Sequence, residues 1–405
     1  MINMQPYSNP RYFIILFVAL LPLIIGLYFG RRFKIYEALV SLLFLVLMFD
    51  GTDAIQGYQL IGYIAFQFLL TFAYERYIRS GRNKSWVFYV VIILAILPLV
   101  VVKIAPHVNN PVADLIGFFG ISYITFKTVE VLMELRDKAI EKVDPVTYAR
   151  FLLFFPTISS GPIDRYKRFA NDCNGAPDRQ EYIEQMRLGT RYIFQGFLYK
   201  FIIGYVFGTL WLPQLAKMSI HMGQGPLKLS WALVGYMYCY SMYLFFDFAG
   251  YSLFAVGTSY FMGIKTPMNF NKPFISKNIK DFWNRWHITL SFWFRDFIFM
   301  RFTFFAMKKK LVKNRKDLSR LSYFIDFLVM GFWHGLTWYY IVYGIYHAFA
   351  IIFNDNWLVF KRKHKDKIPS NKFTKWFAIF LTFNVVCFSF LIFSGFLSTL
   401  WFGWK

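Results

Sequence analysis

Long apolar runs recur along this chain of 405 residues, and they constrain its fold more than any other feature of the sequence. Clear examples are residues 12–29, 35–49, 58–73 and 86–102. Such runs approach the length that an α-helix needs to cross the ~30 Å hydrocarbon core of a bilayer. Only 17% of the residues are charged, against roughly a quarter in soluble proteins. The sequence therefore predicts an all-α polytopic membrane protein.

The basic residues between these runs assign the two sides of the membrane, because cytoplasmic loops collect Lys and Arg. Basic clusters follow the first and third runs, and residues 308–320 and 361–375 each contain seven basic residues and one acidic residue. This pattern predicts about ten crossings, with both termini outside and with re-entrant or interfacial helices in addition. The same rule accounts for the net charge of +23, so nucleic acid is not expected as a partner.

The runs and the charged segments together suggest one integral membrane domain, residues 1–405, with four parts. Residues 112–126 form a fifth run that should return the chain to the cytoplasm, and residues 151–160 are apolar but too short to cross. Residues 321–360 are expected to form an outward and a returning helix that turn near residues 335–338. The four parts are N-terminal helices at 1–126, a helical, solvated cytoplasmic or interfacial segment at 127–191, a core at 192–360, and a cytoplasmic loop with the last helix at 361–405.

His334 stands out because ionisable side chains inside membrane segments cost several kcal/mol unless they are paired or hydrated. It lies thirteen residues beyond Leu321, or ~20 Å along a helix that rises 1.5 Å per residue. A histidine at that depth is a candidate general base, because its ordinary pKa of ~6.5 lets it accept a proton near neutral pH. The alternative is a core residue that bonds across helices, which is the role expected for His347 on the returning helix.

His287 is the second candidate, and it should lie closer to the cytoplasm. About twenty residues separate it from the basic segment that begins at Lys308, too few to cross the membrane twice. His287 is therefore expected near the inner mouth of whatever cavity holds His334. The alternative is an interfacial histidine in an aromatic belt. Three widely spaced cysteines fit no metal-ligand spacing, so no metal site is expected.

Between about residues 155 and 350 the sequence resembles the membrane-bound O-acyltransferase family. The resemblance implies a ring of tilted helices around a thin central channel that is entered from both faces. It places the family's buried catalytic histidine at His334 and its second active-site position at His287. The motifs, in the family's order, are SGPIDRY at 160–166, DFAGYS at 247–252, NFNKPF at 269–274, DFWNRWH at 281–287, FRD at 294–296 and GFWHG at 331–335.

Within that family, the short chain and residues 278–296 are similar to the membrane subunit of the Gram-positive teichoic acid D-alanylation system. This resemblance implies that D-alanine arrives as a thioester on the phosphopantetheine arm of an acidic cytoplasmic carrier protein. The acyl group would leave toward lipoteichoic acid outside the cell membrane, with other D-alanylation proteins as partners and no cofactor bound by the chain itself. Residues expected to orient the arm or its carbonyl are Asn284, Trp286, Arg295, Asp296 and Trp333.

Residues 300–307 form an apolar run that leads into Lys308, Lys309 and Lys310 on the side assigned to the cytoplasm. We expect Phe304 and Phe305, together with these lysines, to dock the acidic carrier. The alternative is a helix anchored in membrane lipids, with its lysines on anionic headgroups.

Two other functions fit the sequence. The first keeps the family and changes the substrates, giving an O-acetyltransferase of an exported polysaccharide. The second is a non-enzymatic carrier or channel for lipid-linked sugars, which should tolerate loss of His334 better than an acyltransferase would.

Overall fold

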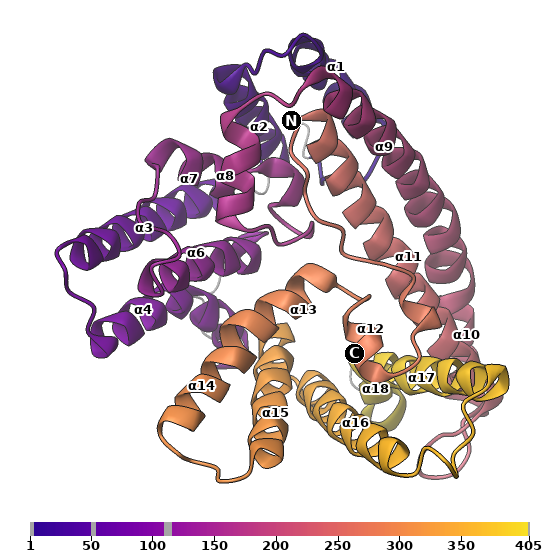
Figure 1. Ribbon diagram of the computed structural model, residues 1–405. Coiled ribbons are helices and arrows are strands. Elements are labelled where there is room, and N and C mark those ends of the chain that lie inside the picture. Colours follow the sequence, from indigo (N-terminus) through magenta and orange to yellow (C-terminus); the bar gives the residue numbers. More distant parts are fainter. Residues whose placement is uncertain (1–3, 50–53, 109–115, 404–405) are drawn as a thin grey trace. The chain divides into compact units, whose positions relative to one another are not determined.

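The computed structural model describes residues 4–49, 54–108 and 116–403 (Figure 1). The regular structure of these residues is helical, and the described part of the chain contains no strand beyond one isolated bridge between Gln224 and Leu229. The prediction of an all-α protein is therefore confirmed.

The chain divides into two compact units. The first consists of residues 1–196 and 251–267, and the second of residues 197–250 and 268–405. The long helix α11 (Trp231–Phe261) contributes residues to both units.

In the first unit, α1 starts where the sequence favours a helix start, because the Asn9 side chain accepts a hydrogen bond from the Tyr12 N–H and Pro10 occupies the first turn. Helix α2 packs on α1, whereas α3 packs on α4 and α6. The helices of this unit are α1 (Pro10–Tyr28), α2 (Lys34–Met48), α3 (Ala54–Arg79), α4 (Ser85–Ile104), η2 (Ala105–Val108), α6 (Ile121–Arg136), α7 (Pro145–Leu152), η3 (Phe155–Thr157), α8 (Tyr166–Asn174) and α9 (Arg179–Phe197).

Helix α6 departs from the expectation for this region. Lys127 was expected in a solvated helix, but its side chain is buried and its Nζ donates to the carbonyl oxygen of Phe151 at 2.8 Å. Glu130 is also buried and accepts a hydrogen bond from the Tyr166 N–H at 3.0 Å. The solvated interpretation is wrong for these two residues, because their partners lie on segments far along the chain. Residues 112–115 of the predicted fifth run lie outside the described residues.

The second unit contains the residues that the sequence singles out as catalytic. Its closest helix pair is α15 with α16, and a Cβ on Gly331 of α15 would lie 2.8 Å from the carbonyl oxygen of Tyr340. The helices are η4 (Leu198–Ile203), η5 (Val206–Trp211), α10 (Leu212–Met222), α11, η6 (Pro273–Ile275), α12 (Ile279–Trp283), α13 (Ile288–Phe294), η7 (Arg295–Phe299), α14 (Met300–Lys308), α15 (Arg315–His334), α16 (Trp338–Lys363), α17 (Lys372–Phe393) and α18 (Phe396–Phe402).

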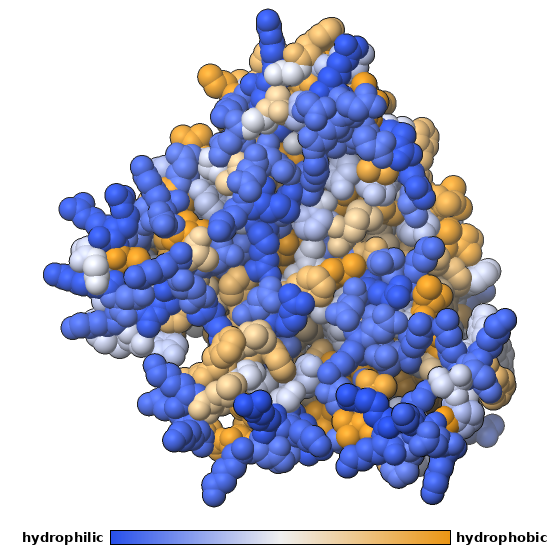
Figure 2. Space-filling model, in the orientation of Figure 1, coloured by the Kyte–Doolittle hydropathy of each residue, from blue (hydrophilic) through white to orange (hydrophobic). Residues whose placement is uncertain are grey.

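The predicted turn near residues 335–338 is confirmed, because α15 ends at His334 and α16 begins at Trp338. Residues 288–308 form a continuous helical stretch in which η7, a π-helical turn, joins α13 to α14. In the view of Figure 2, hydrophilic side chains gather at the lower edge, where the α14–α15 and α16–α17 loops lie in Figure 1.

Five described helices are long and apolar enough to cross a membrane, and the chain is a membrane protein. Other predicted crossings coincide with α2, α3, α15 and α16. Helix α2 is only 15 residues long, so the number of about ten crossings stays a prediction. The five helices are Pro10–Tyr28, Ser85–Val108, Arg179–Met222, Trp231–Phe261 and Lys372–Phe393.

Candidate active site

His334 is the last residue of α15, at the turn into α16. Its half-buried ring lies among aromatic side chains, with ring centroids at 4.6 Å from Trp333, 4.9 Å from Phe393 and 5.9 Å from Tyr340. The next residue must be small, because a Cβ on Gly335 would lie 2.6 Å from the Tyr340 ring. The GFWHG motif therefore ends the helix and holds the imidazole in an aromatic environment.

His287 lies at the N-terminal end of α13 in a left-handed backbone conformation, with φ 42° and ψ 53°. Histidine adopts this conformation more readily than most residues, and such non-glycine positions cluster at functional sites. The side chain is buried, and the edge of the Phe248 ring packs on it with centroids 4.8 Å apart. Its Nε2 has no hydrogen-bond partner among the described residues. The backbone and the neighbouring side chains thus fix the position of the imidazole, while its Nε2 makes no hydrogen bond to a described residue.

Hydrogen bonds from Asn269 hold the backbone around His287. The Asn269 carbonyl oxygen accepts from the Ile288 N–H at 2.9 Å, and its Oδ1 accepts from the Thr289 hydroxyl at 2.6 Å. A further bond runs from the Asn271 N–H to the Arg285 carbonyl oxygen, at 2.9 Å. The segments that contain the NFNKPF and DFWNRWH motifs are therefore hydrogen-bonded to each other, and these bonds fix the backbone position of His287.

The charge state of His287 follows from its burial. Loss of solvent, and to a lesser extent the charge of His334, lowers the pKa of His287 to about 3. The imidazole is therefore neutral at physiological pH and able to donate or accept a hydrogen bond. His287 and His334 both belong to the second unit.

The third buried histidine, His347, is fully engaged. The Trp283 indole N–H donates to its Nδ1 at 3.3 Å, which leaves the ring proton on Nε2. Nε2 then donates to the Ser389 hydroxyl at 3.0 Å, and that hydroxyl donates to the Val386 carbonyl oxygen. These bonds join α12, α16 and α17, so the prediction of an interhelical hydrogen bond is confirmed.

The five residues expected to orient the substrate lie in different environments. Trp333 contacts the His334 ring directly. Trp286 is buried and packs on Phe282 and Phe390, which makes it part of the core beside His287. The remaining three are at least partly exposed to solvent. Asn284 follows α12, and Arg295 and Asp296 pair with each other at 2.8 Å on η7.

Two aromatic residues at the site were not singled out from the sequence. Phe248 forms part of the wall around His287, and it was within reach of sequence reasoning because it belongs to the DFAGYS motif. Phe393 packs on His334 but ends an ordinary apolar helix, α17, so no local signal distinguishes it.

The other ionisable residues in apolar helices have structural partners. Asp247 pairs with Lys200 at 2.5 Å, and Gly250 lets the two helices approach, because a Cβ there would lie 2.8 Å from the Lys200 backbone nitrogen. Asp326 on α15 lies within hydrogen-bonding reach of the Phe299 N–H at the end of η7, while its Oδ1 has no partner among the described residues. A π-helical turn changes the usual backbone hydrogen bonding of a helix. Asp326 is therefore placed to accept from a backbone N–H of that turn.

The family motifs lie within a longer stretch of the chain that matches a known protein family. The model of the membrane-bound O-acyltransferase family matches residues 28–395. The chain belongs to this family. It is therefore an acyltransferase, which argues against a non-enzymatic carrier or channel. Its family motifs supply Phe248 beside His287 and Trp333 beside His334.

Individual relatives of this O-acyltransferase fall into two groups. Teichoic acid D-alanyltransferase of Lacticaseibacillus rhamnosus is 53% identical and covers 99% of this chain and 100% of its own length. The protein of the same name from Bacillus subtilis (strain 168) is 48% identical, over 97% of this chain and 98% of its own length. A probable alginate O-acetylase of Pseudomonas aeruginosa is 30% identical, over 56% of this chain and 41% of its own length.

Proposed function

We propose that this O-acyltransferase moves D-alanine from a carrier-protein thioester on the cytoplasmic side toward hydroxyl groups of lipoteichoic acid outside. Support for the D-alanyl group and for a teichoic acid acceptor comes from relatives of that name that match nearly the whole chain. Two of them come from Lacticaseibacillus rhamnosus and Bacillus subtilis, which favours the cell membrane of a Gram-positive bacterium as the location.

The observation that carries the proposal is the pair of histidines in the second unit. His334 lies in an aromatic environment, and neutral His287 keeps an unused nitrogen nearby. An imidazole in such a site is a suitable general base for an acceptor hydroxyl. A thioester is already activated, so the transfer step needs a base and a positioned carbonyl rather than a further activating reagent.

The proposed reaction conserves atoms and charge. His334 takes the proton from the acceptor hydroxyl while the oxygen attacks the carbonyl carbon of the thioester. The carbon–sulfur bond then breaks, leaving an ester on the acceptor and a thiolate on the phosphopantetheine arm. The imidazolium returns its proton to that thiolate, and the arm leaves as a thiol. No electrons are exchanged, and the arm belongs to the donor rather than to this chain.

His287 is proposed to act on the donor side. Its free Nε2 provides a hydrogen bond for the arm or for the thioester carbonyl, and its neutral state avoids competition with His334 for the proton. Trp333 would flank the reacting carbonyl, whereas Asn284 and the Arg295–Asp296 pair are exposed enough to meet the polar arm.

Acetyl transfer is the second candidate, because the chain also matches a probable alginate O-acetylase. That match covers 56% of this chain, whereas the teichoic acid D-alanyltransferases match 97% or more. The longer similarity favours D-alanine over acetate as the acyl group.

The deciding experiment supplies the reconstituted protein with matched donors. D-alanyl and acetyl thioesters on the same acidic carrier would be offered to the protein in vesicles that also contain lipoteichoic acid as acceptor, and loss of the acyl group from the carrier would be followed by mass spectrometry. We expect deacylation of the D-alanyl carrier only. Deacylation of the acetyl carrier alone would transfer the assignment to O-acetylation, and stability of both thioesters would contradict the carrier as donor.

His287→Asn tests the donor-side role without disturbing the backbone, because asparagine tolerates the left-handed conformation better than alanine does. We expect the variant to need at least about tenfold more donor for half-maximal rate, since it loses a hydrogen bond to the arm. Initial rates over a range of donor concentrations measure this, with His287→Ala as the harsher comparison. An unchanged rate at every donor concentration would remove His287 from the site.

A further inference from the structure

A long apolar groove lies between α2 and α3 in the first unit. It has a volume of about 770 Å³ and runs between residues 42–49 of α2 and residues 54–69 of α3, with Leu153 from another segment at its edge. Among the described residues α2 packs on α1 and η3, and α3 packs on α4 and α6, so these consecutive helices leave the space between them open. None of the described residues that line the groove is charged.

The groove is long enough for an acyl chain. Its α3 wall extends from Ala54 to Leu69, or ~22 Å at 1.5 Å per residue. One leaflet contributes about 15 Å to a hydrocarbon core of ~30 Å. The tail of a lipid in one leaflet could therefore lie along about two thirds of the groove, against Leu45, Ile61 and Ala65.

One end of the groove is polar and basic. Leu42, Leu45 and Leu153 also line a second, smaller cavity, and Glu37 and Arg150 lie at that end. The Glu37 carboxylate pairs with Arg150 at 2.7 Å and with Arg32 at 2.9 Å. Lys34 begins α2 one turn earlier. The Asp144 carboxylate at the start of α7 interacts with Lys34 and with Lys142. Four cationic side chains thus accompany two carboxylates.

Arg150 itself points to a missing partner. Its side chain is only 9% exposed, and its two terminal nitrogens donate to the Glu37 carboxylate at 2.7 Å and to the Cys173 carbonyl oxygen at 3.2 Å. Its buried Nε is left without a hydrogen-bond partner among the described residues. Buried polar groups without partners are rare and call for an explanation. A phosphate oxygen at the end of the groove would supply an acceptor for this N–H and balance the excess positive charge.

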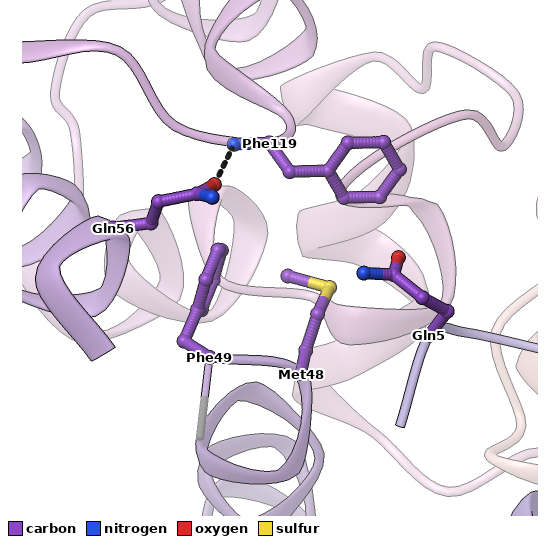
Figure 3. A pocket seen from close by; sticks show the side chains of 5 residues that line it. All are labelled: Gln5, Met48, Phe49, Gln56 and Phe119. Atoms are coloured by element: carbon purple, nitrogen blue, oxygen red, sulfur yellow. Dashed lines mark hydrogen bonds between the residues drawn. The ribbon is translucent and has the colours of Figure 1, made fainter. Parts of the chain in front are cut away.

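The other end of the groove differs in chemistry. Phe49 is shared with a pocket whose other walls are Gln5, Met48, Gln56 and Phe119 (Figure 3). The Gln56 Oε1 already accepts the Phe119 N–H at 3.0 Å, and none of these five residues is charged. An anionic headgroup is therefore favoured at the Arg150 end, which the positive charges assign to the cytoplasmic side.

We propose that the groove between α2 and α3 binds one anionic phospholipid of the inner leaflet, with an acyl chain along α3 and the phosphate beside Arg150. The proposal concerns a binding site in the first unit and does not depend on the acyl group that the enzyme transfers. It would make this part of the protein sensitive to the lipid composition of the membrane.

Retention of phospholipid by the purified full-length protein tests the apolar part. Phosphatidylglycerol and phosphatidylcholine with identical acyl chains would be added in detergent, and bound lipid would be counted by native mass spectrometry. We expect one phosphatidylglycerol per chain at concentrations where phosphatidylcholine does not remain bound. Ala65→Trp should reduce retention at least about tenfold by filling the groove. Ile93→Trp, on the exposed face of α4 outside the groove, is the matched control and should retain the lipid.

The headgroup is tested at Ala38, an exposed residue of the polar cavity that takes no part in the ion pairs. Ala38→Glu should abolish the preference for phosphatidylglycerol by repelling its phosphate, whereas Ala38→Gln adds similar bulk without charge and should keep it. Equal retention of the two lipids by the unmodified protein, or an unchanged preference in Ala38→Glu, would overturn the proposal. A photo-crosslinker at Ile61 that labels a polypeptide rather than lipid in cells would also overturn it.

Discussion

Replacing His334 with alanine is expected to lower the rate of acyl transfer by about 10²- to 10⁴-fold, the range commonly lost with a positioned general base. The imidazole is the titratable group that the GFWHG turn places among Trp333, Tyr340 and Phe393. Without it, the acceptor hydroxyl would have to lose its proton to solvent or to a poorly placed group. Loss of the acyl group from the carrier, followed over time, measures the effect.

The fold should survive this change, because His334 is half-buried at the end of α15 and the helix contacts upstream are untouched. His364→Ala is a suitable control, since His364 is a half-buried histidine after α16 whose ring contacts only Phe360 among the described residues, through that residue's carbonyl oxygen and its ring. We expect the control to keep full activity, and both variants to keep the elution profile and carrier affinity of the unmodified protein. Full activity in His334→Ala would leave His334 as a core residue.

The pH dependence of the rate should separate the proposed roles of His334 and His287. A base must be unprotonated to act, so the rate should fall as the pH drops through the pKa of that base. Burial lowers the pKa of His287 to about 3, so His287 contributes no ionisation between pH 5 and 7. A fall in rate in that interval should therefore persist in His287→Asn and be absent from the residual activity of His334→Ala.

Sequence reasoning located the turn that carries His334 because its signals are local. The apolar segments and the basic loops predicted a turn at residues 335–338, and α15 does end at His334. His347 could likewise be recognised as a structural histidine from its place on the returning helix. These features depend on the hydropathy and charge of short stretches of chain, and both properties can be read from the residue types in the sequence.

Other features depend on partners that are distant in sequence. Lys127 looked solvated because lysine usually is, yet its Nζ is satisfied by Phe151 and Thr157, 24 and 30 residues away. The left-handed backbone conformation of His287 is held by hydrogen bonds between the residues beside it and the segment around Asn269, which lies earlier in the chain. Phe393 reaches His334 only because α17 packs beside α16. Such pairings exist only in the folded chain.

Helix α14 provides the second large expected effect, on binding of the proposed acidic carrier protein. One side of the helix is fixed to α15, through the Thr303–Ser322 hydroxyl contact at 2.8 Å and a fully buried Ala306. The other side exposes Phe304 and Phe305 by 60% and 45%. In Figure 2 a patch of apolar surface lies where Figure 1 shows α14, beside the hydrophilic lower edge.

Phe304→Glu is expected to weaken carrier binding about 30-fold, the effect of losing a central apolar contact worth ~2 kcal/mol. Phe304→Leu is the matched variant, since it keeps an apolar side chain and should retain most of the affinity. Both proteins must remain monodisperse in detergent, so that a loss of binding is not a loss of fold. Titration of the labelled carrier against each purified protein gives the comparison.

The lysines that follow α14 should affect the rate of encounter more than the final affinity. Changing Lys308, Lys309 and Lys310 to glutamate should slow association most at low salt, because surface charges steer an acidic partner and are screened as ionic strength rises. Stopped-flow association at two salt concentrations measures this effect. If carrier binding survives both sets of changes, α14 only anchors the protein in lipid, and residues 127–191 become the next candidate surface. If only the aromatic change matters, the carrier docks through an apolar contact that does not need electrostatic steering.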